Sequence, residues 1–231
     1  MALRDAGLRE LPSTALSLGT AARVLDAGGN ELTELPEAMS SLTSLQRLRL
    51  TANRLTAAGL PNALFDAWGQ MLTVLALDDN RLERLPDAVG LLHALKRLTV
   101  ARNALQQLPT SVGGLQNLEL LDVSGNRLSV MPAELGQCSA LSDVDARNNQ
   151  IAAIPPEWSR LGSLKVRGGG RSDNRNDVQS KGGSVVIFRS SSNTEPQHMN
   201  QKAVESSRNV LESQLLSAFT CSHTTHVGSV F

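Results

Sequence analysis

The chain has 231 residues, of which 41% are hydrophobic and 19% charged, enough apolar material for a sizeable core in one or two domains. Lysine plus arginine and aspartate plus glutamate both number 22, so no excess of charge indicates nucleic acid or an anionic membrane surface as partner. The first residues lack a signal-peptide pattern and no run approaches transmembrane length, so we expect a cytoplasmic protein, with the nucleus as the alternative compartment.

One asparagine-centred pattern recurs along the first two thirds of the chain. Aliphatic residues stand eight, five and three positions before each asparagine and two and five positions after it, and a proline usually follows. The spacings between the asparagines are 23, 27, 23, 23 and 23 residues, a period typical of repeats that stack on one another. The six asparagines are Asn30, Asn53, Asn80, Asn103, Asn126 and Asn149.

Within each copy, the two-residue spacing before the asparagine predicts a short strand with alternate side chains facing inward. Stacked copies then form a parallel sheet. The asparagine ends the strand, and we expect its amide to bond backbone groups of its own and the next turn, a structural role. The proline favours an extended or 3₁₀ return on the other side of the sheet.

This pattern resembles the leucine-rich repeat, and its Leu-Pro ending is similar to the 23-residue intracellular subtype. The order of copies, the irregular repeat from Asn53 to Asn80 and the stretch Gly136–Asp145 look most like the plant proteins that join leucine-rich repeats to a ubiquitin-like domain. That likeness covers roughly residues 1 to 165, and the ubiquitin-like domain itself is absent from the sequence. The resemblance implies an α/β fold: a right-handed solenoid (horseshoe) with a parallel concave β-sheet and a mostly irregular or 3₁₀ convex side.

Taken in chain order, the copies predict a solenoid over residues 1–166 with a partial first repeat, six repeats and the start of a seventh. In the partial repeat Ala6 occupies the asparagine position, so the chain starts inside a repeat. In the longer repeat Phe65 and Trp68 are expected in the core, an exposed contact patch being the alternative. Cys138 occupies an apolar convex position, which predicts a buried thiol.

Residues 167–231 lose the period, and their richness in Gly, Ser, Asn and Gln predicts a largely disordered low-complexity tail. We expect a linker over 167–181. Residues 184–188 predict a strand that caps the open sheet edge, or an aggregation-prone segment if it stays unpaired. Helical spacing of apolar residues predicts an amphipathic helix over 201–219 that folds against the solenoid end.

The abrupt loss of pattern at Val166 also suggests the hypothesis that the tail is translated intron or alternative-frame sequence. Cys221, His223 and His226 have metal-ligand chemistry, but such tight spacing in a tail without a fold indicates an accidental cluster. We therefore expect neither a metal site nor a cofactor.

The outward-facing strand positions predict a binding surface, because solenoids of this kind usually hold partners on the concave face. Arginines should form its centre, and the acidic residues of the last two copies should orient the ligand. The predicted partner-binding residues are Arg47, Arg49, Asp78, Asp79, Arg97, Thr99, Arg102, Asp122, Asp143 and Asp145. The alternative is that these charges only pair with each other, as Asp78 with Arg102 or Arg97 with Asp122.

We therefore predict a non-enzymatic adaptor or scaffold in intracellular signalling, a monomer that binds another protein or peptide and neither nucleic acid nor membrane. No phosphate-binding glycine loop and no recognisable pairing of nucleophile and base supports an enzyme. Two alternatives stay open: a truncated or mis-spliced repeat fragment without independent function, and, implied by the resemblance, a regulatory subunit in a phosphatase or Ras-like GTPase pathway.

Overall fold

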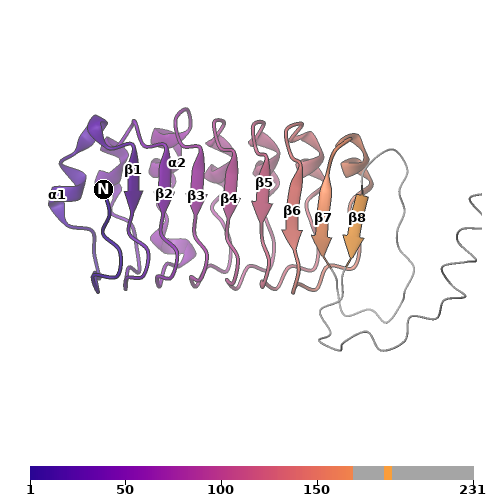
Figure 1. The fold of residues 1–231 in the computed structure, drawn as a ribbon, viewed down its shortest axis with the longest axis horizontal. Helices are drawn as coiled ribbons and strands as arrows, with labels where there is room; N and C mark the ends of the chain where they lie inside the picture. The colour runs from indigo at the N-terminus through magenta and orange to yellow at the C-terminus, as the bar shows by residue number, and fades with distance from the viewer. Residues whose placement is uncertain (169–184, 189–231) are drawn as a thin grey trace, which may run out of the picture. The chain divides into compact units, whose positions relative to one another are not determined.

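Short strands of successive repeats pair side by side in chain order (Figure 1). The computed structural model describes residues 1–168 and 185–188. In this part of the chain eight strands form one sheet, and every neighbouring pair is parallel. The strands are β1 Val24–Asp26, β2 Arg47–Arg49, β3 Val74–Ala76, β4 Arg97–Thr99, β5 Leu120–Asp122, β6 Asp143–Ala146, β7 Lys165–Gly168 and β8 Val185–Phe188. The predicted repeat solenoid with a parallel sheet is confirmed.

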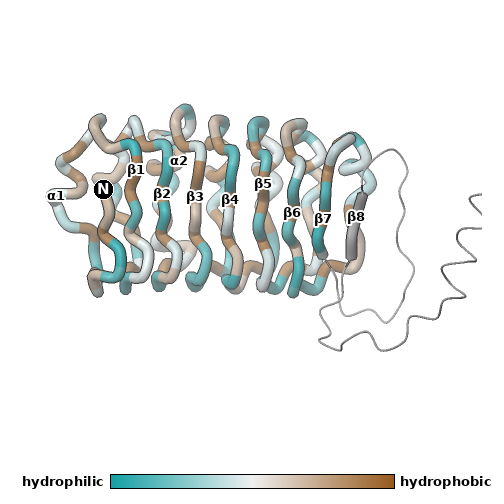
Figure 2. The backbone as a smooth tube through the Cα atoms, viewed as in Figure 1, coloured by the Kyte–Doolittle hydropathy of each residue, from teal (hydrophilic) through white to brown (hydrophobic). Residues whose placement is uncertain are grey.

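Each three-residue strand turns its middle side chain inward, as the two-residue spacing predicts. Leu48 and Leu98, the middle residues of β2 and β4, are both fully buried. Together with the leucines after each asparagine they form one core that runs from Leu11 to Val166. Figure 2 shows hydrophobic segments at corresponding positions of successive turns. No turn has a core of its own, so each depends on its neighbours for burial.

The return segments on the other side of the sheet are mostly short 3₁₀ helices. Each five-residue 3₁₀ helix follows a proline whose φ, between −58° and −69°, is the value that the ring imposes. The helical segments are α1 Ser13–Leu16, η1 Gly19–Ala21, η2 Glu37–Ser41, η3 Ala57–Gly59, α2 Asn62–Trp68, η4 Asp87–Leu91, η5 Thr110–Gly114, η6 Ala133–Gln137 and η7 Pro156–Arg160. The predicted 3₁₀ character of the convex side is confirmed.

The longer repeat uses its extra residues for η3 and the α-helix α2. Phe65 and Trp68 of α2 are each only 1% exposed, and their ring centroids lie 6.3 Å apart. The predicted core position of these aromatic residues is confirmed, and the exposed-patch alternative is wrong. The aromatic residues of the longer repeat therefore pack into the core, as the leucines of the neighbouring repeats do. The added residues lengthen the convex side at this one repeat.

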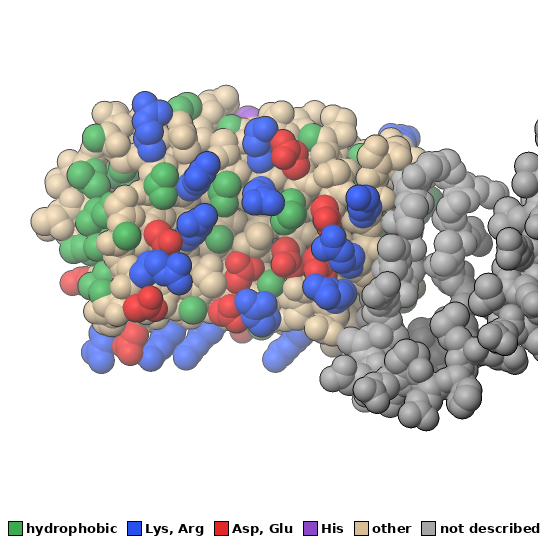
Figure 3. All heavy atoms as spheres, in the orientation of Figure 1, with side chains coloured by type: hydrophobic (Ala, Val, Ile, Leu, Met, Phe, Trp, Pro, Cys, Tyr) green, Lys and Arg blue, Asp and Glu red, His purple; other side chains and the backbone are tan. Residues whose placement is uncertain are grey.

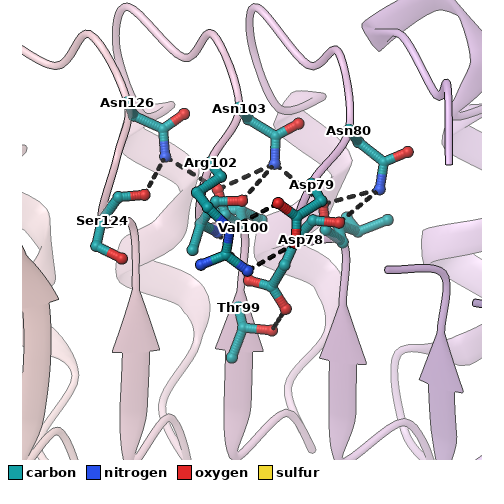
Figure 4. Close-up of polar contacts among 11 residues, drawn as sticks. Asp78, Asp79, Asn80, Thr99, Val100, Arg102, Asn103, Ser124 and Asn126 are labelled. Carbon is teal, nitrogen blue, oxygen red and sulfur yellow. Dashed lines mark hydrogen bonds and ion pairs between the residues drawn. The ribbon is translucent and has the colours of Figure 1, made fainter. Parts of the chain in front are cut away.

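The repeated asparagines bond backbone groups of two turns (Figure 4). Nδ2 of Asn103 donates to the carbonyl oxygens of Leu77 and Val100, at 3.0 and 3.1 Å, and its Oδ1 accepts from the Leu82 N–H at 3.0 Å. The other five asparagines make the equivalent bonds. We expected each asparagine to bond its own turn and the next turn. This expectation is wrong, because each asparagine bonds its own turn and the preceding turn. The carbonyls of Leu77, Val100 and Val123, each three residues before an asparagine, accept from that asparagine and from the asparagine of the following turn.

This direction of bonding is consistent with the partial first repeat. Ala6 stands at an asparagine position. Asn30 instead bonds the first turn, accepting from Ala6 N–H at 3.1 Å and donating to the Leu3 carbonyl at 2.7 Å. A parallel bridge between Ala2 and Asp26 extends the sheet by one position.

The residue before each asparagine position has a left-handed backbone conformation. Its φ lies between +52° and +69° in all seven turns concerned, although only two of the seven residues are glycine. A left-handed backbone costs a residue with a Cβ roughly 1–2 kcal/mol. Ala52 and Arg102 bear this cost because the asparagine bonds on either side fix the bend. At Gly29 a Cβ would meet only the exposed Asp5 carboxylate, which can move aside, so the positive φ rather than the space favours glycine there. The seven residues are Asp5, Gly29, Ala52, Asp79, Arg102, Gly125 and Asn148.

The sheet continues past the predicted solenoid end. Arg167 and Gly168, predicted to begin the linker, are instead the last residues of β7, because Lys165–Gly168 pairs in register with β6. β8 pairs with β7, which confirms the predicted strand at the open edge. The remaining linker residues, the helix over 201–219 and the cluster of Cys221 and the two histidines lie outside the described residues. The division into a solenoid over 1–166 and a tail over 167–231 stays a prediction.

Cys138 is fully buried and free, and its Sγ donates to the Val112 carbonyl at 3.3 Å. Burial raises the pKa of the thiol to about 11. The predicted buried thiol is confirmed. Among the helices of residues 1–168, none has the length and apolar character needed to cross a bilayer.

Replacing Asn103 by alanine should lower the free energy of unfolding by about 1–3 kcal/mol, because the Leu82 N–H loses its acceptor and the Leu77 and Val100 carbonyls each lose one of their two asparagine donors. Asn117→Ala is the control, since this exposed asparagine donates one bond, to the His93 carbonyl. Its effect should stay within about 0.5 kcal/mol. Urea denaturation measures both, and equal losses for the two variants would contradict the proposed role of Asn103.

Cys138 should resist alkylation in the folded chain. A Cys221→Ser variant leaves it as the only thiol. Because its folded pKa is raised, its contribution to stability is complete below the unfolded pKa of about 8.5 and is lost as pH rises toward about 11. At a pH of about 8.5, iodoacetamide followed by mass spectrometry should label it rapidly only in denaturant. Fast labelling of the native chain would show that the thiol is accessible.

The strand face as candidate functional site

The outward side chains of the strands form two rows across the sheet, which together we call the strand face (Figure 3). The strand register fixes both rows, because each strand contributes its first and third residues. The first row is Val24, Arg47, Val74, Arg97, Leu120, Asp143 and Lys165. The second row is Asp26, Arg49, Ala76, Thr99, Asp122, Asp145 and Arg167.

From Val24 to Asp143 the first row alternates aliphatic and charged side chains. Arg47 and Arg97 are exposed, and within the described residues neither forms an ion pair. Two strand spacings, about 10 Å, separate them, with Val74 between. Val24 on one flank is 37% exposed, and Leu120 on the other is half-buried. This row therefore offers guanidinium donors and aliphatic surface at regular intervals.

The second row is largely engaged with its own backbone. Asp122 accepts from the Ser124 N–H at 2.9 Å, and Asp26 and Asp145 accept from the equivalent N–H two residues on, each at 3.2 Å. These carboxylates close the turn after the strand, as short acidic side chains do in loops. Arg49 lies 3.7 Å from the Asp26 carboxylate, a loose and exposed contact.

The predicted residues just before the asparagines form a small cluster with each other (Figure 4). Arg102 donates two bonds of 2.6 Å to the Asp79 carboxylate, which lowers the pKa of Asp79 and raises that of Arg102. Asp78 accepts instead from Thr99 Oγ1 at 2.6 Å and from the Ala101 N–H at 2.8 Å. Arg102 therefore pairs with Asp79 rather than with Asp78 and is less available than Arg47 or Arg97.

The end of the face that was expected to be acidic also carries basic residues. Arg167 of β7 lies 3.1 Å from the Asp143 carboxylate. Arg147 lies 2.6 Å from the Asp145 carboxylate, and the resulting hydrogen bonds raise the pKa of Arg147. Lys165 adds an exposed cation in the first row. The sequence interpretation missed Lys165 and Arg167, although their two-residue spacing around Val166 matches that of Asp143 and Asp145 around Val144.

The side chains of this face have the chemistry of recognition surfaces. Among residues 1–168 and 185–188, no group of three or more His, Cys, Asp or Glu side chains could hold a metal ion. The face provides arginine forks that match carboxylates in geometry and aliphatic side chains that favour apolar contact. Such a surface suits a peptide or the surface of another protein.

Comparison with known proteins agrees with this architecture. The family model for the leucine-rich repeat matches residues 70–128. Among curated proteins, plant intracellular Ras-group-related LRR protein 8 of Oryza sativa subsp. japonica is 35% identical over 106 residues, 44% of this chain and 26% of that protein. Plant intracellular Ras-group-related LRR protein 7 from the same plant is 40% identical over 53 residues, 23% of this chain and 20% of that protein. The matched region thus spans about a quarter of the length of these relatives.

Solved structures share the fold. The LRR ectodomain of the plant membrane receptor kinase GASSHO1/SCHENGEN3 from Arabidopsis thaliana was solved in complex with CASPARIAN STRIP INTEGRITY FACTOR 2. It is 33% identical with a TM-score of 0.59, over 69% of this chain and 20% of that chain. An LRR protein of Leptospira interrogans is 28% identical with a TM-score of 0.52, over 69% of this chain and 45% of that chain. The fold is a leucine-rich repeat solenoid, and its repeats and neighbours support a protein-interaction module.

Proposed function

We propose that this chain is a non-enzymatic adaptor or scaffold that binds another protein or a peptide on its strand face. The observation that carries the proposal is the first row, where Arg47 and Arg97 stand exposed and unpaired among the described residues with Val74 between them. Two arginines without ion partners, next to partly exposed aliphatic side chains, match a ligand that carries both carboxylates and apolar groups.

Arg47, Arg97 and the loosely held Arg49 form the centre of the proposed contact. The Asp79–Arg102 pair and Thr99 flank it, and the acidic residues Asp122, Asp143 and Asp145 orient the ligand at the far end. Asp78 holds Thr99 in place through its hydrogen bond. Breaking these existing pairs would cost binding free energy. In the proposal these residues therefore keep their pairs and shape the rim of the contact.

The names of the rice relatives support two finer parts of the proposal. Both are called plant intracellular Ras-group-related LRR proteins, which favours an adaptor inside the cell and, as a second candidate, a regulatory role in a Ras-like GTPase pathway. The complex of the GASSHO1/SCHENGEN3 ectodomain supports binding through the repeat array itself.

Reversing three charges tests the proposal. The full chain and the variant Arg47→Glu, Arg49→Glu, Arg97→Glu should capture different proteins from a plant cell extract, because the variant repels the carboxylates that the intact face attracts. The control is Arg9→Glu, Arg23→Glu, Arg160→Glu, which makes the same change in charge at exposed positions away from the centre of the face.

Mass spectrometry should identify proteins that are retained by the control and lost from the strand-face variant, while both variants melt within about 2–4 °C of the intact chain. A GTPase among the lost proteins would favour the second candidate. Proteins that bind the strand-face variant as well as the intact chain would contradict the proposal. Absence of a cooperative melt in the intact chain would favour the fragment alternative instead.

A further inference from the structure

A second hollow lies away from the strand face, at the edge where the strands end and the chain turns toward the convex side. Its volume is about 900 Å³, and its walls are residues one to five positions after the repeated asparagines of five successive turns. We call it the edge groove. At about 4.8 Å per turn it extends over roughly 20 Å, the length of about six residues of extended peptide.

Cations dominate the edge groove. Arg81, Arg84 and Arg127 line it, against the single carboxylate of Glu83. All four side chains are exposed, and in residues 1–168 none of the three arginines forms an ion pair. The view in Figure 3 shows Lys and Arg side chains projecting along this edge of the molecule.

In the first repeats the arginines of the same edge are ion-paired. Arg54 lies 3.1 Å from Glu31, and Arg9 lies 3.4 Å from the same carboxylate. The change from paired to unpaired arginines coincides with the start of the edge groove. Unpaired guanidinium groups keep all their donors available, and two or three of them around one hollow attract carboxylates far more than a single exposed arginine does.

The longer second repeat gives the edge groove a wall. Its extra residues form η3 and α2, whereas the following turns return through five-residue 3₁₀ helices. Ala57 and Ala58 of this repeat line the edge groove. A regular array of 23-residue copies would lack these four added residues.

A smaller hollow of about 520 Å³ adjoins the edge groove. Ala57, Arg84 and Gln107 line both hollows. The smaller one adds Pro61, Pro86 and Pro109, together with Asp87. The smaller hollow spans three of the same turns, those of Asn53, Asn80 and Asn103, so the basic part and the proline-lined part of this surface lie side by side.

We propose that the edge groove is a second docking surface, independent of the strand face, which binds an extended acidic peptide segment of a partner protein. Aspartate or glutamate side chains of the segment contact Arg81, Arg84 and Arg127. An apolar side chain that follows them packs against Pro61, Pro86 and Pro109. The length of the hollow favours a peptide over a single small anion, and the balanced charge of the whole chain disfavours nucleic acid.

Phage selection from a random library of peptides of about twelve residues, on the intact chain, tests this proposal. Enriched peptides are synthesised with a fluorescent label and measured by anisotropy. They should carry neighbouring Asp or Glu residues followed by an apolar residue. Binding should weaken about tenfold or more in the variant Arg81→Gln, Arg84→Gln, Arg127→Gln, and also when salt is raised from about 0.05 to about 0.5 M.

Matched variants distinguish binding in the edge groove from binding at the strand face and from a general effect of charge. Arg9→Gln, Arg23→Gln, Arg160→Gln makes the same change in charge elsewhere, and the strand-face variant removes the other proposed site; both should bind the acidic peptides within about twofold of the intact chain. Ala58→Trp fills the edge groove without changing charge and should weaken binding about tenfold, which keeps the test valid if the triple variant folds poorly.

Three results would overturn the proposal: selected peptides without acidic residues, equal binding by the intact chain and the Ala58→Trp variant, or equal loss in the matched charge variant. Loss of binding in the strand-face variant alone would assign the peptides to that face. Because the two sites have separate variants, failure of one proposal leaves the other to be judged by its own experiment.

Discussion

The asparagine side chain that bonds two turns at once is the interaction on which the rest of the structure depends. Three-residue strands are too short to be stable alone, and each turn buries its leucines only against its neighbours. At the strand ends the backbone needs further partners, and the amide of Asn103 supplies three of them between two turns. It also fixes the bend at the left-handed residue before it. The same bonds at every turn hold one register across the sheet.

This register fixes which charged side chains of the strand face lie next to each other, and so which of them are paired. Exposed ion pairs such as Asp79–Arg102 contribute about 0–1 kcal/mol each, less than the bonds of one buried asparagine. The surface charges therefore do not hold the fold, and residues on the face are free to serve recognition. Arg47 and Arg97 stand out because the fixed register places carboxylates beside other arginines but none against these two.

The sequence was sufficient for the period, the inward residues and the two rows, because these follow from the asparagine spacing and the two-residue alternation. It was insufficient where side chains choose among neighbours: Arg102 takes Asp79 rather than Asp78, a choice that depends on rotamers. The left-handed bend was missed because Ala52 and Arg102 carry no glycine signal. β7 was cut short because composition changes at Val166 while the two-residue alternation continues. The edge groove could not be predicted from the sequence, because it depends on where the residues of the longer repeat lie in space.

Native-state hydrogen exchange at single-residue resolution tests the asparagine account most directly. The N–H groups of Leu32, Leu82 and Leu105 lie outside the strands but donate to the asparagine of the following turn. The account predicts that these amides are protected to the same degree as the strand amides of their turns, since both open only when neighbouring turns separate. Exchange as fast as that of exposed loop amides would contradict it and would leave the stack without the constraint that sets its register.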